Sequence, residues 1–172
     1  DNSTINNGTQ LFKTESVQGN DWEEELSMDG TLLSFGQEQL WFLYKLNPES
    51  PLYNVPCLIP WSHPVNGDIL KRVIEKIIER HQSLRTVFST SSGRPEQIIL
   101  EKPNYEFKEV NIHEISSDPQ SWGNEVQKLI TTESQASFDL EKGPTLRAAL
   151  FHFGDQDAWL FLNMHHIISD GK

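Results

Sequence analysis

The sequence is poor in cysteine, in basic residues and in long apolar runs. Its single cysteine, Cys57, cannot form a disulfide within the chain, which is typical of a protein from a reducing compartment. No apolar run approaches the ~18 residues that cross a membrane, and no basic segment followed by an apolar one opens the chain. We therefore expect a cytoplasmic protein without a membrane span or a signal peptide.

Acidic residues outnumber basic ones, 25 Asp and Glu against 14 Lys and Arg, and the formal net charge is −11. Nucleic acids and anionic membranes are both bound through clustered lysine and arginine side chains. The charge balance thus argues against both as partners. Much of the excess lies in residues 1–30, where seven acidic residues stand against one lysine.

Residues 1–31 are rich in Asn, Ser, Thr, Gly and acid, and they follow no sustained hydrophobic period. We expect an acidic, polar linker or tail there, disordered in isolation. Residues 32–172 hold the periodic segments and form the expected folded unit. This length is enough for one compact domain with its own core.

The folded unit mixes helical and strand patterns. Three helices are expected, at 35–46 after the N-cap Ser34, at 68–81, and at 119–135 after the N-cap Asp118. Strands are expected at 54–61, 84–90, 96–101, 105–111, 145–153 and 157–166. The last two form a hairpin, so we expect an α/β class of the layered α+β kind, with helices packed on a mixed, largely antiparallel sheet.

Two of the helices carry more apolar residues than a surface helix needs. The segment 35–46 is apolar almost all round, which predicts a helix sandwiched between other elements. The segment 68–81 repeats apolar residues, and finally His81, at the period of one buried stripe. Pro56 and Pro60 interrupt the strand at 54–61, which is typical of an edge or bulged strand.

The last strand ends in Met164-His165-His166-Ile167-Ile168-Ser169-Asp170-Gly171. Successive strand residues point to opposite faces, so His165 and His166 diverge and only one of them serves a given cavity. A buried histidine with satisfied hydrogen bonds is the simpler interpretation of such a residue. A metal site is disfavoured, because adjacent strand residues do not readily chelate one ion. Imidazole beside a turn also suits proton exchange near neutral pH.

Three ordered motifs resemble those of condensation domains of nonribosomal peptide synthetases. Ser34–Leu43 resembles Ser-x-Ala-Gln-x-Arg-Leu-Trp-x-Leu, although Gly36 replaces the usual Ala and Gln39 the usual Arg. Arg80–Phe88 matches Arg-His-x-x-Leu-Arg-Thr-x-Phe in full. Met164–Gly171 matches Met-His-His-x-Ile-Ser-Asp-Gly, with Lys172 in place of the usual following aromatic or Val.

The resemblance covers about residues 32–172 and implies a chloramphenicol acetyltransferase-like lobe. A complete condensation domain joins two such lobes, so the chain would be the N-terminal lobe, and its C-terminal lobe would be a missing partner. The substrates would be two thioesters on donor and acceptor carrier proteins, joined as an amide. Phosphopantetheine would arrive on those carrier proteins, and no cofactor or metal would be bound directly.

The resemblance also implies roles for the motif residues. His166 would be the catalytic residue, while His165, Asp170 and Gly171 would shape its turn. An arginine of the second motif would pair with Asp170, and Arg85 is the first candidate before Arg80. A guanidinium that leads inward on a strand needs such a carboxylate.

Other functions fit parts of this pattern. An epimerisation domain shares the His-His-x-x-x-Asp-Gly motif, but its first motif differs from the one seen here. A heterocyclisation domain has aspartates in place of the histidines. A non-catalytic condensation-like module that recruits a partner protein is a third alternative, which the Gln39 and Lys172 departures leave open. A lobe that serves only to dock carrier proteins is a fourth.

Overall fold

The computed structural model describes residues 13–16, 30–91, 93–154 and 157–169. Its centre is a five-stranded sheet in the order β1-β6-β7-β8-β3, whose neighbours pair antiparallel except for the parallel pair β6 and β7. The strands are β1 (Lys13–Ser16), β3 (Asn54–Trp61), β6 (Glu106–Asn111), β7 (Leu146–Phe153) and β8 (Asp157–His165). The mixed, largely antiparallel sheet predicted from the sequence is confirmed.

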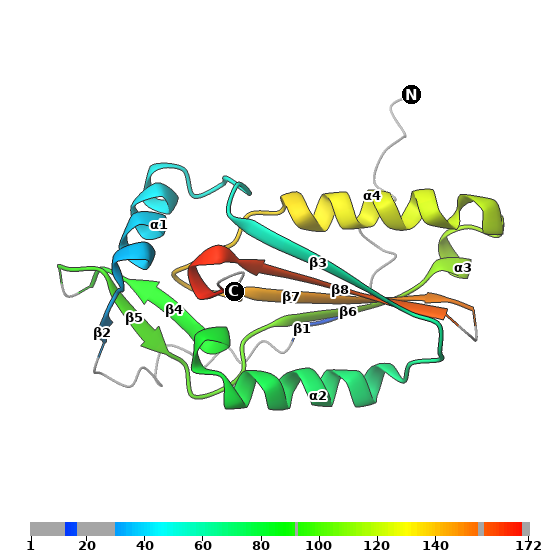
Figure 1. Cartoon of the computed structure of the whole chain (residues 1–172), viewed down its shortest axis with the longest axis horizontal. Coiled ribbons are helices and arrows are strands. Elements are labelled where there is room, and N and C mark those ends of the chain that lie inside the picture. Colours follow the sequence, from blue (N-terminus) through cyan, green and yellow to red (C-terminus); the bar gives the residue numbers. More distant parts are fainter. Residues whose placement is uncertain (1–12, 17–29, 92, 155–156, 170–172) are drawn as a thin grey trace, which may run out of the picture.

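A smaller sheet lies beside the large one (Figure 1). Its order is β2-β5-β4, with β2 (Thr31–Leu32), β5 (Glu96–Ile99) and β4 (Thr86–Ser89) all paired antiparallel. Both β1 and the start of β2 fall within residues 1–31, so two short paired segments occur in the predicted linker. The rest of that linker, up to residue 29, lies outside the described residues.

Helices cover both faces of the large sheet. Figure 1 shows α2 (Gly67–Arg80) below the sheet and α4 (Trp122–Gln135) above it. Alternate residues of β7 and β8 face them, so Leu150 and Leu160 pack in the α2 core while Phe151 and Phe161 pack in the α4 core. Among the described residues no helix is long and apolar enough to cross a membrane.

A third core lies under α1 (Phe35–Leu46), beside the small sheet. Trp41 of α1 packs with Phe88 of β4, and with Ile167 and Ile168 from the turn that follows β8. The turn is the 3-10 helix η3 (His166–Ile168), and further short helical segments are η1 (Gln82–Arg85), α3 (Ile112–Ile115) and η2 (Pro119–Ser121). This core therefore supports the turn that carries His166.

The helices begin close to the predicted residues, and two details of their surroundings differ. Ser34 caps α1 in a capping box, since its side chain accepts from the Gln37 backbone while the Gln37 side chain accepts from the Ser34 backbone. The expected sandwiching of α1 is wrong, because Trp41 is its only buried residue. Asp118 caps η2, whose chain continues directly into α4.

The predicted buried stripe of 68–81 is only half buried. Ile74 and Ile78 enter the core, whereas Ile69, Val73 and Ile77 are about half exposed, and His81 is exposed at the helix end. The stripe is wider than the contact with the sheet. The packing of His81 that the period predicted is therefore wrong.

The β3 strand forms one edge of the large sheet, as its two prolines predicted. The Tyr53 carbonyl accepts a hydrogen bond from the His166 N–H at 2.8 Å, so the odd-numbered residues of β3 turn their backbone groups toward β8. Pro56 and Pro60 stand on the outward-facing positions, where a missing N–H removes no bond within the sheet.

Candidate functional site

The histidine pair lies where the β7–β8 hairpin ends. The last strand stops at His165, and His166 begins η3. The prediction placed both histidines on the strand, one residue too far, but the divergence of their side chains is confirmed. His165 is 3% exposed, and His166 is exposed on the surface.

His165 is a buried, structural histidine. Its ring lies between the aromatic rings of Tyr53 and Phe138, with ring centroids 6.2 and 6.3 Å away. Burial, followed by the nearby charge of His166, lowers the pKa of His165 to about 4, so the ring is neutral near pH 7. Its Nδ1 atom accepts the Ile167 N–H at 3.1 Å. His165 thus holds the first turn of η3.

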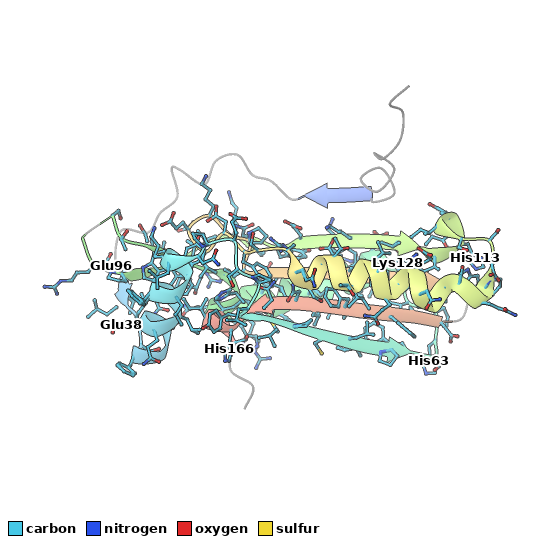
Figure 2. The ribbon with its side chains drawn as sticks, turned by 90° about the horizontal axis from the view of Figure 1, so that it is seen from above. Glu38, His63, Glu96, His113, Lys128 and His166 are labelled. Carbon is cyan, nitrogen blue, oxygen red and sulfur yellow. The ribbon has the colours of Figure 1, made fainter. Side chains whose placement is uncertain are left out.

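His166 presents its other ring nitrogen outward. The Nδ1 atom lies 2.7 Å from the Ser169 carbonyl oxygen, which only accepts hydrogen bonds, so Nδ1 carries the proton of the neutral ring. The Nε2 atom then keeps its lone pair. Figure 2 shows His166 at the α1 end of the molecule, with His63 and His113 at the opposite end. The turn therefore offers a proton acceptor from a fixed backbone position.

Arg85 and Arg80 differ in position. The prediction of a strand at 84–90 is wrong at its start, because Arg85 belongs to η1 and the strand begins at Thr86. Arg85 is half-buried and donates to the Leu100 carbonyl through one NH group, while its buried Nε has no partner among the described residues. Arg80 is exposed on α2. The expected partner Asp170, like Gly171, lies outside the described residues.

The described residues hold no cluster of three or more His, Cys, Asp or Glu side chains that could bind a metal ion. His165 and His166 point apart and do not form one. Cys57 is a free, exposed thiol on β3. The chemistry that the described part of the site supports is therefore that of a histidine base and of hydrogen bonds.

Two further polar contacts support the turn, and the sequence prediction missed them. The Gln37 side chain donates to the Ile167 carbonyl at 3.4 Å and so links α1 to η3. Arg147 of β7 donates to the carbonyls of Ala136 and Ser137, next to the buried Phe138. Both side chains act on backbone carbonyls far away in the chain. The signals available were their places in the first motif and in the Gly-Pro-Thr-Leu-Arg segment.

The sequence model of the family described as "Condensation domain" matches residues 28–172. The chain belongs to the condensation domain family. Among curated proteins, one of the linear gramicidin synthases of Brevibacillus parabrevis is 40% identical over 139 residues, which cover 81% of this chain and 2% of that protein. Phosphinothricin tripeptide synthetase PhsC of Streptomyces viridochromogenes is 34% identical, over 81% of this chain and 13% of its own length.

Solved condensation domains share the fold. The starter condensation domain of rhizomide synthetase RzmA, in its R148A mutant, superposes with a TM-score of 0.73 at 23% identity, over 83% of this chain and 34% of that one. The first condensation domain of the calcium-dependent antibiotic synthetase gives 0.74 at 19% identity, over 84% and 36%. The chain thus spans about a third of these structures, and the predicted α/β lobe is confirmed.

Proposed function

We propose that this chain supplies the catalytic histidine half of a domain that joins two carrier-bound thioesters through an amide bond. The observation that carries the proposal is His166, whose Nδ1 is bound to the Ser169 carbonyl and whose Nε2 is left to act outward. The family membership and the nonribosomal peptide synthetases among the relatives support it.

The reaction needs one proton transfer, which a neutral imidazole suits. The α-amino group of the acceptor attacks the thioester carbonyl of the donor, forming the C–N bond. The C–S bond then breaks, and the proton lost by the nitrogen ends on the thiol of the donor's phosphopantetheine. His166 Nε2 fits two roles, accepting that proton as a general base or accepting a hydrogen bond that orients the amine.

The partners in this proposal are a donor and an acceptor carrier protein, each delivering phosphopantetheine, together with the second lobe of the domain. The chain spans only part of the relatives, so these partners belong to the complete synthetase. The proposal assigns no metal and no cofactor bound to this lobe, and it places the reaction in the cytoplasm.

The test is the substitution His166→Ala in the complete condensation domain, loaded with aminoacyl donor and acceptor carrier proteins. Mass spectrometry of the acceptor should show loss of the dipeptidyl product. His63→Ala removes an exposed histidine at the far end of the lobe and should leave the rate unchanged. A folded His166→Ala domain that forms product at the parental rate would refute the assignment.

A further inference from the structure

The C-terminal end of α4 is held by side chains from three neighbouring strands. Asn163 of β8 donates to the Glu133 carbonyl at 2.8 Å. Asn54 of β3 donates to the Ser134 and Ala136 carbonyls at 2.7 and 2.9 Å. Arg147 of β7 donates to the Ala136 and Ser137 carbonyls at 3.1 and 2.7 Å. These bonds satisfy carbonyls at and just beyond the helix end that lack partners within the helix.

The strand register gathers these donors around His165. Arg147 stands opposite Asn163 on the neighbouring strand, and Asn54 stands opposite His165. Asn163 and His165 are two residues apart on β8, so all four side chains lie on the face that α4 covers. The end of α4 is therefore fastened to the part of the sheet from which the His166 turn departs.

Arg147 does more than satisfy carbonyls. Its guanidinium lies over the Phe138 ring, 4.1 Å from the ring centroid, and the Phe138 ring meets the His165 ring edge-on at 83°. Its Nε atom is also 3.7 Å from a carboxylate oxygen of Glu106. One side chain thus orients the ring that packs against His165, which in turn bonds the Ile167 N–H.

The charge of Arg147 suits this place. The last turn of α4 carries no basic residue of its own, although the C-terminal end of a helix favours a positive charge. Asn163 is fully buried, so water cannot replace its bond to Glu133. A fixed cation and a fixed amide at this end are costly to place, and their common neighbour is His165.

We propose that Arg147 and Asn163 are positioning residues for the His166 turn. They act through the contact of Arg147 with Phe138 and of Phe138 with His165, and they keep the His166 Nδ1–Ser169 bond, and so the lone pair of Nε2, in place. This inference rests on the proposed function of His166. It concerns the orientation of the ring and assigns neither residue a contact with substrate.

The test compares Arg147→Met and Arg147→Lys with Lys108→Met in the complete condensation domain. Lys108 is a matched control, because it forms a mostly buried 2.6 Å ion pair with Glu133 of the same α4 turn but sits on β6. Three quantities are measured: the single-turnover rate of amide formation, Tm, and the ¹⁵N NMR signals that report which His166 nitrogen is protonated.

Arg147→Met is expected to slow amide formation by roughly 10²-fold, the scale of a misplaced reacting group, and to mix the two His166 tautomers. Arg147→Lys keeps the charge without the paired bonds, and we expect an intermediate rate at nearly parental Tm. Lys108→Met should lower Tm while the rate and the His166 signals stay parental. If Arg147→Met does not fold, the Lys variant decides the question through the same three measurements.

Parental His166 signals and rate in the folded Arg147 variants would overturn the proposal. A rate loss accompanied only by a fall in Tm, with the tautomer unchanged, would also overturn it and leave Arg147 a structural residue. If the parent domain forms no amide at all, the proposed function fails. The NMR signals would still decide whether Arg147 positions His166.

Discussion

The His166 Nδ1 atom lies 2.7 Å from the Ser169 carbonyl oxygen, within the same turn. This short bond selects one neutral tautomer without a second side chain. The turn itself is fixed from both ends, by the His166 N–H on the Tyr53 carbonyl and by the Ile167 N–H on His165. Small changes around this turn should therefore appear first as changes in His166.

The first prediction concerns stability at low pH. The pKa of His165 is lowered to about 4, against an ordinary value of 6.5 in the unfolded chain. As the pH falls through 6.5 the unfolded chain takes up a proton that the folded chain refuses until about pH 4. The free energy of unfolding should therefore fall by about 3 kcal/mol across this window.

Denaturant unfolding at pH 7 and pH 4.5, compared with His165→Gln, isolates this contribution. The variant should be less stable at pH 7 and should lose less stability on acidification than the parent. His63→Gln removes an exposed histidine and should follow the parent curve. Equal pH slopes for the parent and His165→Gln would contradict the prediction.

The second prediction concerns a partner for Arg85. Its buried Nε has no partner among the described residues, which fits a carboxylate supplied by Asp170. Removing one member of a buried ion pair strands the other, at about 3–5 kcal/mol. We expect Arg85→Met and Asp170→Asn each to cost this much in the complete domain, and the double variant to cost clearly less than their sum.

Denaturant unfolding of the four proteins in this cycle measures the coupling. Arg80 was the second candidate, but it is exposed on α2, so Arg80→Met should change stability by at most about 0.5 kcal/mol. Additive losses for Arg85 and Asp170 would show that the two side chains do not meet.

The third prediction concerns the exposed apolar face of α1. Phe35, Phe42 and Leu46 are between 61% and 76% exposed on this one helix. An exposed apolar patch favours association, so this chain by itself should self-associate at high concentration. Phe42→Ser with Leu46→Ser should lower the weight-average mass in sedimentation equilibrium, whereas Glu38→Ser on the same helix should not. A monomeric parent chain would show that the face is harmless.

The fourth prediction concerns this chain alone. Amide formation needs both thioesters held together, an effect that can be worth about 7–11 kcal/mol. The chain spans about a third of the solved condensation domains, so we expect a folded lobe that forms no product with loaded carrier proteins. Mass spectrometry of such a mixture tests it. Turnover at the rate of a complete domain would show that one lobe suffices.

Patterns with a fixed period were predicted well, and side-chain reach was not. The alternation along β8 separated buried His165 from exposed His166, because strand geometry alone sets that contrast. The period of α2 did not reveal that Val73 and Ile77 stay exposed, since the width of a stripe does not give the width of its contact. The bonds of Arg147 and Gln37 end on backbone carbonyls, which leave no pattern in the sequence.

The prolines of β3 also bear on how the lobe meets other chains. Along its outward edge, Pro56 and Pro60 offer no N–H, and the Asn54 N–H is already bonded to the Pro51 carbonyl at 3.0 Å. Of the four outward-facing residues of this strand, only Leu58 still has an N–H to give a strand arriving from outside. Exposed sheet edges template aggregation through such unpaired groups. This edge therefore offers an intruding strand too few hydrogen bonds to extend the sheet.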